Sequence, residues 1–64
     1  MYYAKIMRDN GDEEMHSADR TIWDSRSRTL RVVHFDTETY DIELGSYDRA
    51  YLMTSTGQTI TQYK

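Results

Sequence analysis

The chain has 64 residues, 38% of them hydrophobic, no cysteine, and a net charge of −3 from eight basic and eleven acidic residues. This length allows at most one domain, residues 1–64, and the lack of cysteine excludes both a disulfide framework and a thiolate metal site. No apolar run approaches the roughly 20 residues of a membrane-spanning helix, and the acidic charge argues against general affinity for nucleic acid or anionic membranes.

The first predicted element is a strand from Tyr2 to Arg8, whose even-numbered residues from 2 to 6 form an apolar face. Residues 9–14 combine an Asn-Gly turn dipeptide with four acidic side chains, which predicts an exposed loop. Residues 15–20 are ambiguous. Their apolar positions fall at helical spacing behind an acidic first turn, which is typical of a single helical turn.

A hairpin is predicted next. Thr21–Asp24 and Thr29–Phe35 are rich in β-forming residues, and Ser25–Arg28 has the length of a hairpin connection. The second of these strands is the most apolar segment, with apolar side chains on both faces, which predicts a central position in the sheet. Tyr40–Leu44 then alternates apolar and acidic residues without a break, which predicts a strand with one buried face.

The C-terminal part of the chain supports two interpretations. In one, Ser46 caps a short helix within residues 46–56. In the other, Ala50–Thr54 and Thr59–Tyr63 form a hairpin, which the many β-branched threonines favour. The preferred fold is therefore mainly β, a small antiparallel sheet of five or six strands rolled toward a barrel or sandwich. A fold of the α+β class with one short helix is the alternative.

Residue types that serve in catalysis are present, but no motif organises them. The chain has two histidines with several serines and acids, yet it contains no nucleophile elbow, glycine-rich phosphate loop or metalloprotease helix. We interpret His34 as a half-buried strand residue whose ring bonds a neighbour. The acidic loop of residues 9–14 does not follow the ligand order of a calcium site. We therefore expect no enzymatic activity, no cofactor and no metal.

Charge follows an acidic, basic, acidic order over residues 9–19, 20–34 and 36–48. One account is that neighbouring antiparallel strands pair opposite charges across their outer face, which stabilises the sheet and sets its register. The other is that one acidic block stays unpaired and steers the protein onto a basic surface of a partner. The candidate acidic patch comprises Asp36, Glu38, Asp41 and Glu43.

Tyrosine, tryptophan and arginine are abundant, and these residue types concentrate in binding hot spots. The candidate partner-binding residues are Trp23, Arg26, Arg28, Arg31, Tyr47 and Tyr51. We therefore expect a non-enzymatic protein-binding module, such as a small inhibitor of the phage or mobile-element type that blocks a partner's site. The alternative is a small β-barrel nucleic-acid-binding protein that uses the arginine-rich hairpin and the aromatic residues.

Two further expectations concern the setting of the protein. The N-terminus lacks the pattern of a secretory signal, so we expect cytoplasmic localisation. The chain has no proline to protect the edges of its sheet from pairing with another chain. A homo-oligomer, most simply a homodimer, is therefore a further candidate assembly.

Overall fold

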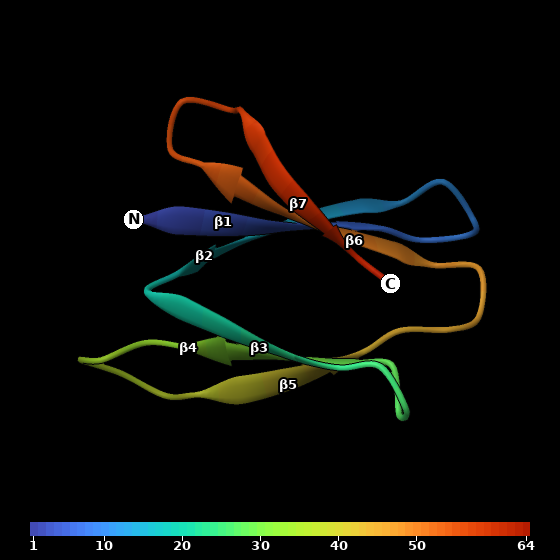
Figure 1. The fold of residues 1–64 in the computed structure, drawn as a ribbon, viewed down its shortest axis with the longest axis horizontal. Helices are drawn as coiled ribbons and strands as arrows, with labels where there is room; N and C mark the ends of the chain where they lie inside the picture. The colour runs from blue at the N-terminus through green and yellow to red at the C-terminus, as the bar shows by residue number, and fades with distance from the viewer.

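The computed structural model describes residues 1–64 and contains seven β-strands in two antiparallel sheets. The strands are β1 (Tyr2–Met7), β2 (Glu13–Ala18), β3 (Arg20–Asp24), β4 (Thr29–Val33), β5 (Tyr40–Glu43), β6 (Arg49–Thr54) and β7 (Thr59–Tyr63). One sheet has the order β2-β1-β6-β7 and the other the order β3-β4-β5. Figure 1 shows the two sheets as two layers, one above the other.

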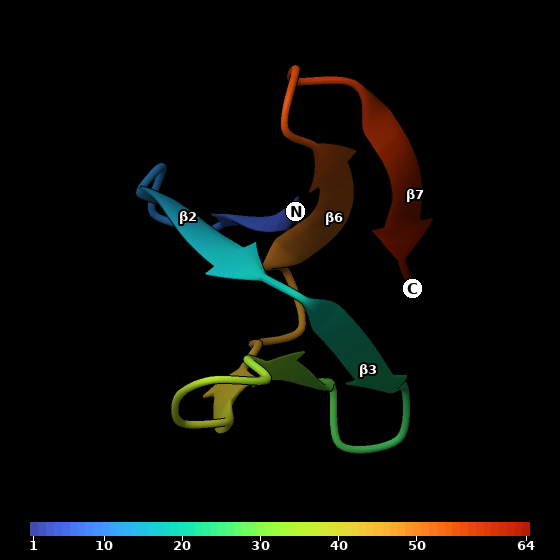
Figure 2. The ribbon, with the colours of Figure 1, turned by 90° about the vertical axis from the view of Figure 1, so that its left-hand side faces the viewer.

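The chain passes from one sheet to the other at Asp19, the single residue between β2 and β3 (Figure 2). The main-chain N–H of Asp19 donates to the carbonyl of Val33 at 3.0 Å, and its carboxylate accepts from the N–H of Phe35 at 2.9 Å. Asp19 therefore fixes this corner to the end of β4. The chain returns to the four-stranded sheet through residues 44–48.

The core between the two sheets is small. Its buried side chains are all apolar, namely Ala4, Ile6, Ala18, Leu30, Val32, Ile42, Leu44 and Ala50. The four-stranded sheet contributes three alanines to this core, so the larger side chains of the three-stranded sheet can approach it closely. Trp23 and Tyr63 are partly buried and pack against the same cluster.

The mainly β prediction is confirmed, but the strand count and the shape differ in detail. The structure has seven strands in two sheets with no closed barrel, rather than one sheet of five or six. The additional strand is β2. Residues 15–20, whose pattern was ambiguous, do not form a helical turn, because residues 13–18 pair with β1 from Tyr2↔Ala18 to Met7↔Glu13. The exposed loop is correspondingly shorter, since residues 13 and 14 belong to β2.

The hairpin interpretation of the C-terminal part is confirmed, and the helix within residues 46–56 is wrong. β6 lies between β1 and β7, so its main chain is paired on both sides. Its residue Ala50 is fully buried on the inner face. Gly57, in the turn to β7, has a φ of 94°, which a glycine adopts without strain. Pairing with β1 thus stabilises an extended segment that would form only a marginal isolated helix.

The prediction that β4 is central is confirmed, but only one of its faces is buried. Leu30 and Val32 are fully buried, whereas Phe35, beyond the end of the strand, is 72% exposed. In β5 the alternation is observed, with Ile42 buried and the acidic residues exposed. Tyr40 is 37% exposed and does not belong to the core cluster.

Removal of a core side chain should destabilise the fold far more than removal of the same side chain from the surface. Ile6 is fully buried, so Ile6→Ala should lower the free energy of unfolding by about 2 to 5 kcal/mol. Ile22 is 48% exposed, so Ile22→Ala should cost under about 1 kcal/mol. Urea denaturation of both variants measures the difference. Equal losses would contradict the assignment of Ile6 to the core.

Candidate functional site

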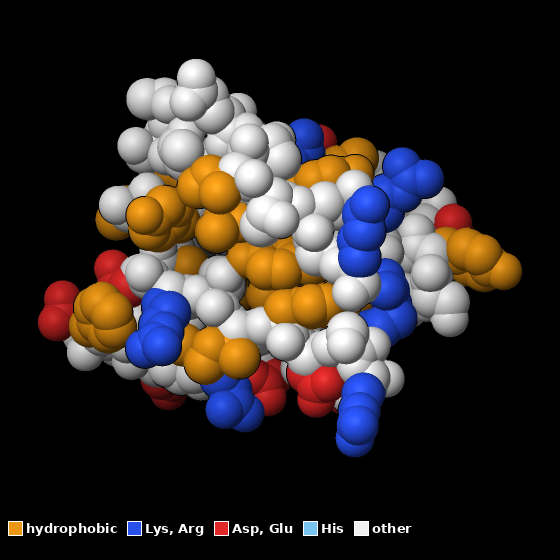
Figure 3. Space-filling model, viewed as in Figure 1, with side chains coloured by type: hydrophobic (Ala, Val, Ile, Leu, Met, Phe, Trp, Pro, Cys, Tyr) orange, Lys and Arg blue, Asp and Glu red, His pale blue; other side chains and the backbone are white.

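A groove of about 340 Å³ lies where three distant segments meet. These are the β3–β4 turn, the connection between β5 and β6, and the end of β7. The groove is lined by Arg28, Ser46, Tyr47, Asp48, Arg49, Gln62, Tyr63 and Lys64. We call it the cationic groove. Figure 3 shows Lys and Arg side chains gathered at this end of the molecule, where the β5–β6 connection and the C-terminus lie in Figure 1.

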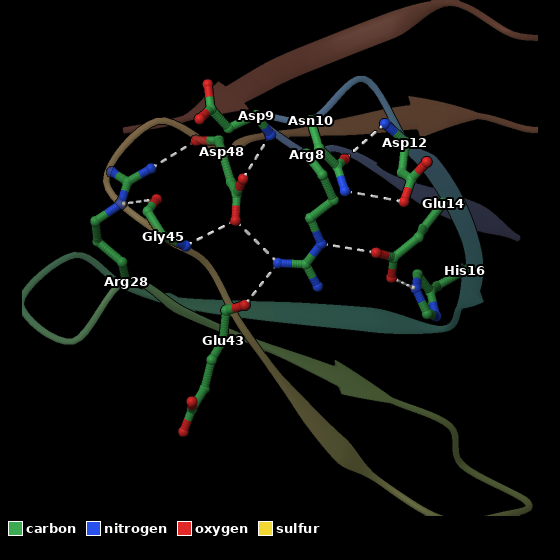
Figure 4. Close-up of polar contacts among 10 residues, drawn as sticks. All are labelled: Arg8, Asp9, Asn10, Asp12, Glu14, His16, Arg28, Glu43, Gly45 and Asp48. Carbon is green, nitrogen blue, oxygen red and sulfur yellow. Dashed lines mark hydrogen bonds and ion pairs between the residues drawn. The ribbon is translucent and has the colours of Figure 1, made fainter.

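Arg28 is held rigidly in this groove. It has a φ of 51°, a backbone conformation uncommon for residues other than glycine, and its guanidinium carbon lies 5.7 Å from the centre of the Trp23 ring. Its Nη2 donates to the carbonyl of Asp48 at 2.7 Å and its Nε to the carbonyl of Gly45 at 3.1 Å (Figure 4). These acceptors are neutral, so the hydrogen bonds fix the guanidinium without cancelling its charge.

The other cations of the groove have no acidic partner either. The ion pairs of the structure use Lys5, Arg8, His16 and Arg31 as their basic members. Arg49 and Lys64 are exposed and form none, and Tyr47 beside them is 79% exposed. The groove therefore combines three basic side chains that form no ion pair with an accessible aromatic ring, although the chain as a whole has a charge of −3.

Asp48 also lines the groove, but its carboxylate is engaged elsewhere. Oδ1 accepts from the N–H of Asp9 at 2.8 Å, and Oδ2 accepts from the N–H of Gly45 at 2.8 Å and from Nη1 of Arg8 at 3.0 Å (Figure 4). The hydrogen bonds from Gly45 and Asp9, followed by that from Arg8, hold the pKa of Asp48 below its usual value. The side chain is only 12% exposed.

Trp23 forms the support behind the groove. Its ring centre lies 5.7 Å from that of Tyr63, and its indole N–H donates to the main-chain oxygen of Lys64 at 3.0 Å. The hydroxyl of Tyr63 hydrogen-bonds with Thr21, and burial raises the pKa of Tyr63. These contacts fix the end of β7 against β3, so the wall of the groove joins both sheets.

The predicted partner-binding residues fall into two groups. Trp23, Arg28 and Tyr47 come together at the cationic groove, and the exposed Arg26 lies in the same turn as Arg28. Arg31 and Tyr51 do not join them. Arg31 is on the outer face of the three-stranded sheet, and Tyr51 is on the outer face of the four-stranded sheet, opposite Lys5 and Gln62.

The candidate acidic patch is also divided. Nε of Arg31 donates to Asp41 at 2.9 Å from the neighbouring strand and holds the pKa of Asp41 below its usual value. This is the cross-strand pairing that the first account of the charge order predicts. Asp36, Glu38 and Glu43 are exposed and form no ion pair. The steering role remains a prediction for these three.

Sequence analysis missed the network centred on Arg8. Its Nε donates to Glu14 at 2.7 Å, and its Nη1 donates to the carbonyl of Glu43 at 2.8 Å as well as to Asp48 (Figure 4). Arg8 lowers the pKa of Glu14, and His16 lowers it further. The network ties the end of β1 to β2 and to the β5–β6 connection. Its members are distant in sequence, so no local pattern indicates it.

His16 connects this network to Tyr40. Its Nε2 lies 3.2 Å from a carboxylate oxygen of Glu14, and its Nδ1 lies 2.8 Å from the hydroxyl of Tyr40. Burial raises the pKa of Tyr40, which disfavours a nucleophilic phenolate. No groove or hollow of the structure is lined by His16 or Tyr40. His34 is half-buried and its Nδ1 lies 3.2 Å from the carbonyl of Glu38, as predicted, but it follows the end of β4 at Val33 and is not a strand residue.

No group of three or more His, Asp and Glu side chains is arranged to hold a metal ion. The structure has no helix of the length and apolarity that crossing a membrane requires. No protein-family model, curated protein or solved structure matches the chain. The function is therefore inferred from the cationic groove and its surroundings.

The charge of Asp48 should contribute to stability in a pH-dependent way. Because its pKa is lowered by folding, its contribution is complete above the usual aspartate pKa near 4 and is lost as the pH falls through the lower folded-state value. Asp48→Asn should therefore be less stable than the wild type at pH 7, and its stability should fall less steeply on acidification.

Thermal unfolding monitored at a series of acidic and neutral pH values measures this effect. Asp36→Asn is the matched control, because Asp36 is exposed and forms no ion pair. Its unfolding should follow the wild type at every pH. An unaltered pH profile in Asp48→Asn would show that the network does not support the fold.

Proposed function

We propose that the protein is a non-enzymatic binding module that recognises an acidic segment of another protein in the cationic groove. The observation that carries this proposal is the convergence of Arg28, Arg49 and Lys64, none of them paired with a carboxylate, around the exposed ring of Tyr47. Complementary charge favours association with an acidic segment, and arginine with tyrosine is a frequent combination at binding hot spots.

The rigidity of Arg28 supports the same proposal. Two carbonyls and the Trp23 ring already hold its guanidinium, so a ligand does not have to order this side chain on binding. Arg49, Lys64 and Tyr47 lie around it at the surface and can adjust to the ligand. A volume of about 340 Å³ suits one or a few side chains of a docked segment.

The exposed carboxylates provide a second charged surface that can interact with the partner. Asp36 and Glu38 lie in the β4–β5 loop and Glu43 lies in β5, all outside the cationic groove. We propose that these acids steer the module toward a basic region of the partner, next to the acidic segment that the groove takes. A module of this kind acts by occupying a partner's site, as a small inhibitor of the phage or mobile-element type does.

Nucleic acid is the second candidate ligand, because the same cations can contact phosphates and Tyr47 can stack a base. One observation weighs against it. The ring centres of Trp23 and Tyr63 lie 5.7 Å apart and the two rings pack on each other, which leaves Tyr47 as the one exposed ring of the groove that can stack a base.

Titration with two labelled polyanions tests the proposal. The probes are a fluorescein-labelled poly-glutamate peptide and a single-stranded oligothymidylate of equal charge, and fluorescence anisotropy reports binding. We expect the peptide to bind more tightly, and we expect Arg49→Glu to weaken it by about tenfold. Tyr47→Ala should weaken it as well, since the ring lies at the rim of the groove.

Arg20→Glu is the matched control, because Arg20 is exposed, forms no ion pair and does not line the groove. It makes the same change in net charge as Arg49→Glu. Equal loss of binding in the two variants would contradict a local site at the groove. Tight binding of oligothymidylate with a steep salt dependence, and none of the peptide, would favour the nucleic-acid candidate instead.

A further inference from the structure

The guanidinium of Arg28 keeps part of its hydrogen-bonding capacity free. An arginine has five N–H donors, and here Nε and Nη2 donate to the carbonyls of Gly45 and Asp48. Nη1 forms no hydrogen bond, and Figure 4 shows it on the side of the guanidinium away from both carbonyls. One edge of a rigidly held guanidinium in the cationic groove is therefore open to a ligand.

The other donors of the cationic groove are free as well. Four more of its side chains take part in none of the side-chain hydrogen bonds of the structure, namely Ser46, Arg49, Gln62 and Lys64. They supply a hydroxyl, a guanidinium, an amide and an ammonium group. Together with Arg28, they line one space of about 340 Å³ with more donors than a single carboxylate can use.

We propose that the cationic groove recognises a phosphorylated side chain of its partner, a phosphomonoester, in preference to carboxylates. This inference rests on the proposed function, because it specifies the acidic segment that the groove takes. A phosphomonoester has a charge of about −1.5 to −2 at neutral pH and three strong acceptor oxygens. A carboxylate has a single charge and two oxygens. Three basic side chains and two neutral donors in one groove match the phosphomonoester better.

Arg28 supplies the geometric part of this match. Arginine presents its N–H groups in a planar fork that suits the oxygens of a phosphate group. Two carbonyls and the Trp23 ring hold this fork in place before a ligand binds. Arg49 and Lys64 are exposed, so they can move to contact the remaining oxygens. The exposed ring of Tyr47 is available to the residues that flank the phosphorylated one.

The same comparison separates a phosphomonoester from nucleic acid. Each backbone phosphate of nucleic acid is a diester with one negative charge and two free oxygens, so it uses fewer of the donors in the groove. Proteins that bind single strands also follow the backbone along an extended cationic groove. The cationic groove has a volume that suits one or a few side chains. It therefore fits one phosphoryl group better than a row of them.

Fluorescence anisotropy with three labelled peptides tests the proposal. The central position of each peptide, flanked by two glutamates on either side, holds phosphoserine, a pair of glutamates or serine. The first two peptides have nearly the same charge at pH 7.5, so they differ mainly in the geometry of the anion. We expect the phosphoserine peptide to bind at least about tenfold more tightly than the glutamate-pair peptide, and the serine peptide to bind most weakly.

Acidification gives a second readout. The second ionisation of a phosphomonoester has a pKa near 6, so the phosphoserine peptide should bind about threefold more weakly at pH 5.5 than at pH 7.5. Glutamates keep their charge over this range, so the glutamate-pair peptide should bind equally at both pH values. Neither His16 nor His34 lines the groove, so their titration does not distinguish the two peptides. The same pH response in both peptides would contradict recognition of the phosphoryl dianion.

Arg49→Gln should remove most of the preference for phosphoserine, because it removes an exposed guanidinium from the groove. Arg20→Gln is the matched control, since Arg20 is exposed, forms no ion pair and lies outside the groove. Equal binding of the phosphoserine and glutamate-pair peptides would overturn this inference and leave the proposed function intact. Absence of binding by every acidic peptide would refute both. Oligothymidylate that binds as tightly as the phosphoserine peptide would overturn the inference in favour of nucleic acid.

Discussion

The carboxylate of Asp48 is the contact on which the arrangement of this small protein depends. It accepts hydrogen bonds from the main chain of Asp9 and Gly45 and from the side chain of Arg8, and so ties the β5–β6 connection to the β1–β2 hairpin. The carbonyls of Asp48 and Gly45 in turn hold Arg28, from the β3–β4 turn. The β5–β6 connection therefore joins the β1–β2 hairpin to the β3–β4 turn, whose Arg28 lines the cationic groove.

This arrangement separates the roles of the charged side chains. Arg8, Arg31 and Lys5 each form an ion pair with a carboxylate on a neighbouring segment. These pairs support the two sheets. The cations of the groove are left without such partners. A chain with a charge of −3 thereby gains a local positive surface, because the carboxylate of Asp48, which lines the groove, is already hydrogen-bonded within the fold.

The sequence predicts the hairpins well because their patterns are local. The alternation in residues 40–44 needs no distant contact to be recognised, and the threonines around Gly57 favour a hairpin over the short helix that the same segment also allows. β2 was missed because its short segment also satisfies helical spacing, and pairing with β1 decides between the two. Trp23, Arg28 and Tyr47 were selected from their residue types. Their convergence depends on contacts across 20 residues or more, such as that between Arg28 and Asp48, which the sequence does not reveal.

NMR mapping of a bound acidic peptide tests the central claim most directly, because it locates the ligand rather than only detecting it. Trp23 is the only tryptophan, so its indole signal reports on the support behind Arg28 without ambiguity. Addition of poly-glutamate should shift this signal together with the amides of residues 46–49, while those on the outer face of β4 and β5 stay in place. Shifts confined to other surfaces, or none at saturating peptide, would contradict the assignment of the cationic groove as the binding site.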